Sequence, residues 1–471
     1  MKKISAILLT CLFLTSCTFG PRYCQPIMDM PEQQITGGIS PYINPKWWEM
    51  FGSANLNSFV QEALENNKTL AIALAQTEQA FAQLRITRAS LFPEADIGAN
   101  TNWGTLAPSG QIAPDPVEAF SIAPKVSFEL DIWGKNRKLS ESDRARYFAT
   151  RAAYDLSRLM VSANVVNAYF LVLSLDASIE ILKTAIADGE KINEVYLKRL
   201  KAGTISRADY LRVRANSETD KATLIDLQAQ LSAAKSALAI LCGRSPRDIV
   251  EKDIKRSKNI NELIVVPQIP AGLNSEILRY RPDVRQAEQN LISANALIGV
   301  ARAEYFPEIA LTGTAGYASA ALVGLISPAT AFWSLAGGLT APIFQGGRIR
   351  AANRAAEAAA RQAFAEYQLA VENAFKDVYD ALTANRLRRN ILAHSKQAAK
   401  DMQASYNIAR AQFNAGIIDT VNLLDIRRTM LNARLNMVNS QYNLLTAVSG
   451  LSKALGGGWQ AKPVQVACSK E

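Results

Sequence analysis

The sequence LFPE at Leu91–Glu94 returns as YFPE at Tyr305–Glu308, and two further stretches return with it in the same order. These further pairs are DIWGKNR at Asp131–Arg137 with IFQGGRI at Ile343–Ile349, and KAGTI at Lys201–Ile205 with NAGII at Asn414–Ile418. The three separations agree to within two positions, which chance similarity does not produce three times in one order. The chain is therefore two copies of one unit, which we place at 46–260 and 261–459.

Each unit contains two segments in which apolar and polar side chains alternate. They lie at Glu94–Trp103 and Phe120–Asp131 in the first unit, and we expect β-hairpins over 94–131 and 308–343. The apolar set comprises Ile97, Trp103, Ile122, Val126, Phe128, Ile309, Leu311, Tyr317, Trp333, Leu335 and Leu339, and the polar set includes Asp96, Lys125, Thr314 and Ser334. A two-residue period over about ten residues is typical of transmembrane β-barrel strands.

The second hairpin region also permits another interpretation. Residues 309–347 carry no charge, so a hydropathy profile favours one membrane helix there. Pro328 and Pro342 argue against a helix, and the matching region of the first unit carries Asp96 and Lys125, which a membrane helix tolerates poorly. We therefore expect strands in both units.

Long helical stretches follow each hairpin. No proline occurs between Pro124 and Pro246 or between Pro342 and Pro463, and strong helix formers dominate there. Gly203 interrupts the first stretch near its middle, as does Gly416 in the second. We expect helical hairpins over 134–242 and 346–455, each arm up to ~100 Å long at 1.5 Å per residue.

The number of strands indicates how many chains assemble. Two hairpins give four strands, too few to close a barrel, and an open edge in lipid leaves backbone groups unpaired. A dimer gives eight strands, whose interior side chains fill, whereas the twelve strands of a trimer leave an aqueous lumen. The polar face of each strand favours the trimer.

Composition excludes several classes of function. The net charge is +10, but lysine and arginine are dispersed among acidic residues, so we expect no nucleic-acid partner. His394 is the single histidine, and it lies in a polar helical segment. Nucleotide-binding glycine loops, nucleophile elbows and paired metal ligands are lacking in the sequence. We expect no enzyme, no catalytic residue, no cofactor and no metal site.

The N-terminus has the form of a bacterial lipoprotein signal. Two lysines precede an apolar stretch too short to span a bilayer, followed by the lipobox residues Leu14 to Cys17. We expect a signal peptide at 1–16, a lipid on Cys17 and, because Thr18 follows, sorting to the outer membrane. Residues 17–45 then form an anchor segment and 460–471 a C-terminal tail. Cys24 and Cys468 could form a disulfide if the termini meet, or remain free thiols.

Longer motifs carry a resemblance to a known family. They are GLNSEILRYRPDVRQAEQNLISANALIGVARAEYFPE at Gly272–Glu308, FELDIWGKNR at Phe128–Arg137, LTAPIFQGGRIRA at Leu339–Ala351, LLDIRR at Leu423–Arg428 and KALGGGW at Lys453–Trp459. Together with Trp47, Trp48 and Phe51, they resemble the TolC-like outer-membrane efflux lipoproteins over essentially the whole mature chain.

This resemblance implies an architecture and a function. It implies a mixed α and β fold: a trimeric 12-stranded transmembrane barrel, four strands per chain, continued by a long periplasmic α-helical barrel. It further implies the exit duct of a tripartite pump, joined through a periplasmic adaptor to an inner-membrane transporter of the resistance-nodulation-division class. A protein-secretion exit channel and a lipid-anchored spacer without a pore remain the alternatives.

The resemblance also suggests site residues. TolC closes its periplasmic end with two aspartates three residues apart; Asp425 matches the second, but Asn422 stands at the first. We expect Asp425 to take part in the gate with a basic partner, Arg428 being nearest, although Arg427 or Arg212 could serve. The hairpin tips, with Gly203 and Thr204 in one unit and Gly416 and Ile417 in the other, are the expected adaptor contacts.

Overall fold

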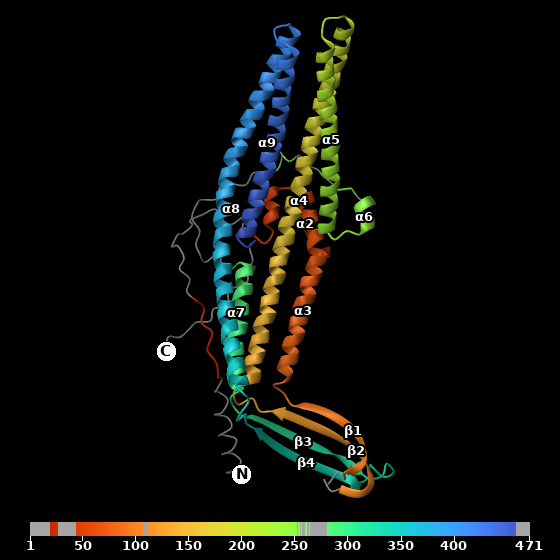
Figure 1. Cartoon of the computed structure of the whole chain (residues 1–471), viewed down its shortest axis with the longest axis vertical. Coiled ribbons are helices and arrows are strands. Elements are labelled where there is room, and N and C mark those ends of the chain that lie inside the picture. The colour runs from red at the N-terminus through yellow and green to blue at the C-terminus, as the bar shows by residue number, and fades with distance from the viewer. Residues whose placement is uncertain are drawn as a thin grey trace.

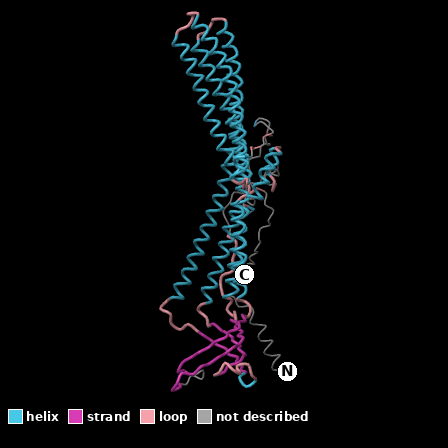
Figure 2. The backbone as a smooth tube through the Cα atoms, turned by 90° about the vertical axis from the view of Figure 1, so that its right-hand side faces the viewer, coloured by secondary structure: helices cyan, strands magenta, loops and turns pink. Residues whose placement is uncertain are grey.

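The molecule is long and narrow. The computed structural model describes residues 19–26, 44–106, 112–251, 253–254, 256, 260, 263 and 280–457. Long helices run along its main axis, and a β-sheet lies at one end (Figures 1 and 2). The turns of the two longest helical hairpins lie side by side at the opposite end (Figure 1). Cys17, the signal peptide and the C-terminal tail lie outside the described residues.

The sheet has four antiparallel strands in the order of the chain, β1–β2–β3–β4. Their bounds are β1 Glu94–Leu106, β2 Ile112–Glu129, β3 Glu308–Ser319 and β4 Ala331–Thr340. Strands, not a membrane helix, therefore occupy the uncharged second region. The first hairpin keeps its predicted place, but both of its strands extend further toward the turn than the alternating segments 94–103 and 120–131. The stretch IAPDPVEA at 112–119 forms strand although its sequence does not alternate.

The register of the sheet separates the two sets of side chains. Asp96 pairs with Lys125, Lys125 with Thr314 and Thr314 with Ser334, so a polar row crosses all four strands on one face. The predicted apolar residues lie at alternate positions and therefore on the other face. Five of them are more than two-thirds exposed in the single chain: Ile97, Trp103, Trp333, Leu335 and Leu339. The alternation predicted from the sequence is confirmed.

A proline and a glycine meet in the middle of this sheet. Pro124 in β2 donates no ladder hydrogen bond, and the pairing of β2 with β3 skips from Ile122 to Lys125. Gly316 of β3 lies against this point, where an added Cβ would be 2.3 Å from the Ile122 carbonyl oxygen. Glycine is therefore required there for the close approach of the two strands.

The helices form two similar series. The first repeat contains η2 Trp47–Phe51, α2 Ala54–Asn66, α3 Lys68–Ala89, α4 Lys135–Lys201, α5 Arg207–Leu241 and α6 Pro246–Glu251. The second contains α7 Pro282–Ala303, the short η5 Pro328–Thr330, α8 Arg348–Asn414 and α9 Thr420–Ala454. Helices α4 and α8 have 67 residues each, about 100 Å, and both begin after a glycine with positive φ, Gly134 and Gly347. The mixed fold built twice is thus confirmed.

An apolar core joins the two repeats near the middle of the molecule. Trp47 and Phe51 of η2 are almost fully buried, and the Phe51 ring packs edge-on against Phe170 of α4, with centroids 4.8 Å apart. Burial of a side chain of this size contributes about 1.5–3 kcal/mol. One window of α4 is apolar enough to cross a bilayer, but 67% of it is buried inside the chain, which identifies α4 as a core helix.

Each repeat has a polar joint where its long hairpin returns to its short helix. Asn67, the N-cap of α3, donates to the Leu241 carbonyl at the end of α5, 2.7 Å away. Arg281, the N-cap of α7, donates to the Ala454 carbonyl at the end of α9, 2.8 Å away. Two residues beyond each of these carbonyls, Gly243 and Gly456 have positive φ. The two joints are therefore equivalent, although their side chains differ.

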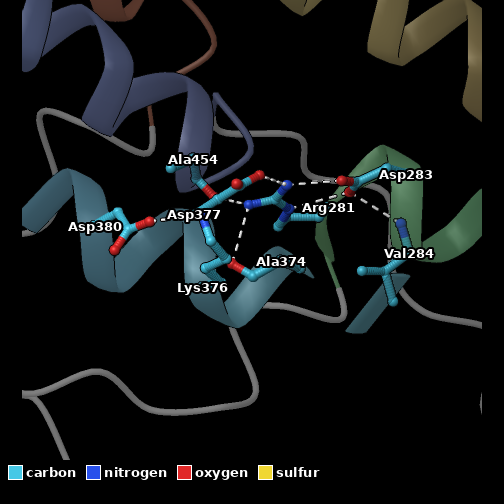
Figure 3. Close-up of polar contacts among 8 residues, drawn as sticks. All are labelled: Arg281, Asp283, Val284, Ala374, Lys376, Asp377, Asp380 and Ala454. Atoms are coloured by element: carbon cyan, nitrogen blue, oxygen red, sulfur yellow. Dashed lines mark hydrogen bonds and ion pairs between the residues drawn. The ribbon is translucent and has the colours of Figure 1, made fainter. Parts of the chain in front are cut away.

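The Arg281 joint holds three helices together (Figure 3). The buried guanidinium also donates to Asp283 of α7, at 2.7 Å, and to Asp377 of α8, at 3.0 Å. A further bond reaches the Ala374 carbonyl of α8 at 3.2 Å. The carboxylates offset the cost of burying the charge. In the first repeat, the ion pair at the joint is a separate one: Arg244, three residues after the end of α5, donates to both carboxylate oxygens of Glu62 in α2, at 2.7 and 2.9 Å.

Candidate functional site

The two hairpin tips are built in the same way. Gly203 and Gly416 follow the ends of α4 and α8 with φ of +70° and +76°, and an added Cβ at either would meet no atom within 4 Å. The residue after each glycine, Thr204 or Ile417, donates its backbone N–H to a carbonyl of the preceding helix, at 3.0 and 2.9 Å. Glycine is favoured at both positions because the backbone is left-handed there, and not because a side chain would lack space.

A capping residue starts the return helix at each tip. The Ser206 hydroxyl accepts from the Asp209 N–H at 3.1 Å, and the Asp419 carboxylate accepts from the Asn422 N–H at 2.9 Å. Such caps typically stabilise a helix by about 1 kcal/mol. Asn422 thus has a backbone role in this cap, while its side chain is exposed.

Asp425 and Arg428, both predicted for the gate, lie together on α9. The Arg428 Nη2 atom donates to Asp425 Oδ1 at 2.7 Å, so Arg428 is the partner among the alternatives considered. Both side chains are more than 60% exposed in the single chain. A pair this exposed contributes only ~0–1 kcal/mol to stability, so it leaves the helix free to rearrange.

Arg427 has a different and more buried role. Its Nη2 atom donates to Asp220 Oδ2 of α5 at 2.8 Å and to the Ala185 carbonyl of α4 at 2.6 Å. Gly189 of α4 provides the space, because an added Cβ there would lie 3.2 Å from Arg427 Nη2. This clamp, Arg427 with Asp220, ties α9 of the second repeat to both long helices of the first.

Aromatic contacts also join the repeats near the tips. Tyr196 of α4 stacks on Phe413 of α8, with centroids 5.8 Å apart and planes 8° apart, and its hydroxyl donates to Thr420 Oγ1 at 2.8 Å. Burial raises the pKa of Tyr196, which keeps this phenol protonated at neutral pH. The guanidinium of Arg199 lies over the other ring, 5.0 Å from the Phe413 centroid.

The cysteines are found in different states. Cys24 is disulfide-bonded, and its partner lies outside the described residues, as does Cys468. Cys242 is a free, buried thiol that faces the Phe59 carbonyl at 3.7 Å. Burial raises the pKa of Cys242 to about 12.

Sequence reasoning did not assign the clamp or the Arg281 joint. The sequence suggests Arg427 only as an alternative partner for Asp425, and Asp220 lies 207 residues away in the other repeat. The one sequence signal for the clamp is Gly189, a glycine inside a long helix, where glycine costs about 1 kcal/mol relative to alanine.

Comparison with known proteins agrees with this architecture. The model of the outer membrane efflux protein family matches residues 59–244 and again 273–457. The chain therefore belongs to the outer membrane efflux protein family, and the double match confirms the repeat. The predicted resemblance and outer-membrane location are confirmed with it.

Individual relatives match nearly end to end. The cation efflux system protein CusC of Escherichia coli O157:H7 is 29% identical over 458 residues, covering 95% of this chain and 97% of that protein. The solvent efflux pump outer membrane protein SrpC of Pseudomonas putida is 30% identical, covering 98% and 99%. The crystal structure of the Campylobacter jejuni CmeC outer membrane channel superimposes with a TM-score of 0.86 at 27% identity, covering 94% and 95%.

Proposed function

We propose that this protein is one third of a passive duct through which an efflux pump discharges small molecules across the outer membrane. The observation that carries the proposal is the division of the sheet, with an exposed apolar face and a polar row of Asp96, Lys125, Thr314 and Ser334. An apolar face suits lipid, and a polar face suits a water-filled lumen. The units 46–260 and 261–459, which enclose the two family matches, are the proposed repeats.

Closure of the barrel requires other copies of the chain. The sheet ends at β1 and β4, and neither outer edge is paired among the described residues. Because an unpaired edge in hydrocarbon costs several kcal/mol for each unsatisfied group, β1 of one chain is expected to pair with β4 of the next. Three copies give twelve strands and room for a lumen, and the same symmetry arranges the helical hairpins as a tube.

The Asp425 pair is proposed as the gate at the periplasmic end of this tube. Three copies of Asp425 around a narrow axis repel one another unless each is paired, and Arg428 supplies the pairing charge at 2.7 Å. Asn422 stands one turn closer to the tip. An adaptor that contacts Gly203, Thr204, Gly416 and Ile417 at the tips can rearrange these exposed pairs and let the helices separate.

Single-channel conductance in planar bilayers tests the duct and the gate together. Wild-type protein should conduct, and Asp425→Ala should raise the conductance without lowering the stability of the trimer. Asp401→Ala is the matched control, since Asp401 is an exposed carboxylate of α8 whose hydrogen-bond partner is the neighbouring Gln397. If the wild-type protein never conducts, the alternative of a lipid-anchored spacer without a pore is favoured. If Asp425→Ala leaves the conductance unchanged, residues other than Asp425 form the constriction.

The partners follow from the same architecture. The tips lie far from the sheet, so a tube anchored in the outer membrane presents them to a periplasmic adaptor and, through it, to an inner-membrane transporter of the resistance-nodulation-division class. The relatives are named for cation and solvent efflux, which suggests that the pump rather than the duct selects the substrate. Crosslinking followed by co-purification should recover both partners.

The lipid anchor is also a proposal. Cys17 ends a lipobox, and we infer that it carries the acyl chains of the mature protein. Mass spectrometry of the N-terminal peptide should show the acylated cysteine. An unmodified Cys17 would contradict this proposal, and the barrel alone would then attach the protein to the membrane.

A further inference from the structure

The two hairpin tips are alike in backbone but differ in charge, although they lie side by side at the end of the molecule (Figure 1). Residues 198–214 around Gly203 include six basic residues and one acidic residue, a net charge of +5. The equivalent residues 411–427 around Gly416 include one basic and two acidic residues, a net charge of −1. Where the first tip has Lys198, Lys201 and Arg207, the second has Ala411, Asn414 and Thr420.

The basic side chains of the first tip have few partners within the chain. Arg199 lies over the Phe413 ring, 5.0 Å from its centroid. The nearby acidic residue, Asp209, accepts from the Ser206 hydroxyl at 2.7 Å. Among the residues that the structure describes, the other five basic side chains form no ion pair and no hydrogen bond, and all are exposed: Lys198, Lys201, Arg207, Arg212 and Arg214.

The helix dipoles account for only part of this positive charge. Lys198 and Lys201 lie in the last turn of α4, where the dipole favours cations. Arg207 is the first residue of α5, where the dipole disfavours a cation. Since neither its helix nor an ion pair in the described chain stabilises this charge, Arg207 is suited to an anionic partner outside the chain.

Exposed leucines accompany the cations at the first tip. Leu197 lies one turn before Lys201 on α4, and Leu211 lies one turn after Arg207 on α5, so each leucine shares a helix face with a cation. The two leucines are each seven residues from Thr204 in the turn, and the two cations are each three residues from it. The hairpin therefore presents a level of cations at its end and a level of exposed leucines, 38% and 48% exposed, behind it.

The second tip does not repeat this pattern. The residues equivalent to the two leucines are Arg410 and Leu424, and Leu424 is buried. The exposed apolar residues of the second tip are instead Ile417 and Val421, and no cation stands at the positions equivalent to Lys201 and Arg207. The two tips of one chain therefore offer different chemistry to a partner.

We propose that the first tip is a docking site for an acidic helical surface, which carries carboxylates at its end and an apolar residue one turn behind them. This inference rests on the proposed exit duct, whose tips face a periplasmic adaptor, and it assigns the acidic surface to that adaptor. The apolar residues of such a helix pack on the exposed leucines, while its carboxylates pair with Lys201 and Arg207. Charge complementarity of this kind orients a partner and excludes wrong ones, so the adaptor distinguishes the first tip from the second.

Synthetic helical hairpin peptides test this chemistry directly. The acidic peptide carries two glutamates at its turn with a leucine one turn behind each, and the neutral peptide carries glutamines in place of the glutamates. Binding to the full-length protein in detergent is measured by fluorescence anisotropy. The acidic peptide should bind about tenfold more tightly, the factor that two exposed ion pairs supply. This preference should vanish at about 1 M salt, where the Debye length is about 3 Å.

A pair of double variants locates the binding site. Lys201→Gln with Arg207→Gln should abolish the preference for the acidic peptide. Arg386→Gln with Arg388→Gln is the matched control, because it removes the same charge from exposed positions in the middle of α8, and it should keep the preference. Equal binding of both peptides by the wild type, or a preference retained by the tip variant, would overturn the docking site. Loss of the trimer in the tip variant alone, seen by native mass spectrometry, would also overturn it, because the cations would then bind a neighbouring copy.

The adaptor recovered by crosslinking supplies the last test. The end of its helical hairpin should carry carboxylates, and their replacement by lysine should restore binding to Lys201→Glu with Arg207→Glu. An adaptor whose crosslinked segment has no carboxylate would contradict the proposal. Failure of the duct itself gives a different result, since a wild-type protein that never conducts refutes the duct while the peptides still decide whether the first tip binds an acidic helix.

Discussion

The clamp between Arg427 and Asp220 should contribute far more to stability than the gate pair one residue away. The side chains of Arg427 and Asp220 are 7% and 16% exposed, against 73% and 61% for Arg428 and Asp425. Removing one partner of a buried pair leaves an uncompensated charge and costs about 3–5 kcal/mol. Because Asp220 retains some access to water, we expect the lower end, about 3 kcal/mol per chain, for Arg427→Met.

A double-mutant cycle isolates this interaction. Arg427→Met, Asp220→Ala and the double variant should be unfolded in denaturant at one fixed protein concentration, because assembly makes apparent stability depend on concentration. The double variant should be more stable than the Arg427→Met variant, since no charge remains buried, and the coupling energy should be about 2–3 kcal/mol. Asp425→Ala, the exposed control, should stay within about 1 kcal/mol of the wild type.

The same variants connect stability to gating. Arg427 ties α9 to α4 and α5, so its loss should also raise the open fraction of single channels, whereas Asp425→Ala should raise conductance without the loss of stability. A cost below about 1 kcal/mol for Arg427→Met, or a coupling energy near zero, would refute the argument that burial makes this pair a structural tie.

Three further predictions follow from the other polar groups. Arg281→Met should lower the free energy of unfolding in denaturant by about 3 kcal/mol, because it leaves a helix-end carbonyl and two carboxylates without their partner. Asn67→Ala should lower it by only about 1–2 kcal/mol. Equal losses for the two variants would contradict the argument from charge. The pKa of the Cys242 thiol is raised to about 12, so between about pH 9 and pH 12 the folded state holds a proton that the unfolded state releases. The free energy of unfolding should therefore fall by up to roughly 4 kcal/mol as the pH rises through this range. Cys242→Ala should remove this fall from the profile of stability against pH. Cys24 is disulfide-bonded and Cys242 is free, so with Cys17 acylated and the signal removed we expect Cys468 as the partner, and non-reducing peptide mapping should find that crosslink.

Periodicity explains why the fold was predictable from the sequence. The strands follow from a two-residue alternation, and the register then places Asp96, Lys125, Thr314 and Ser334 in one row, as that alternation requires. The long helices follow from the lack of proline, and their turns from single glycines. Each of these signals is local, so one sequence was sufficient to find it.

The polar ties could not be found in this way because they join residues far apart in the chain. Arg427 and Asp220 belong to different repeats, and only their distance in space, 2.8 Å, identifies them as partners. Among many arginines that look alike in sequence, burial alone distinguishes Arg427 from Arg428. The equivalence of the joints at Asn67 and Arg281 cannot be predicted from the sequence for another reason, because the two residues are of different types. What the repeats share is a side chain that donates to the last carbonyl of the returning helix.

That difference between the joints has a mechanical consequence for the duct. The base of the second hairpin, whose far end carries Asp425, is held by an arginine that binds α7, α8 and α9 together. The base of the first hairpin is held by the neutral Asn67 amide, which reaches the end of α5, and by the Arg244–Glu62 ion pair, which reaches α2; neither contact bridges three helices. A hairpin fixed at its base moves its tip by bending along its length, and a 67-residue helix can bend gently without breaking hydrogen bonds. The clamp at Arg427 lies on the path of that bend, between the base and the tip, so it resists the movement that the exposed Asp425 pair permits.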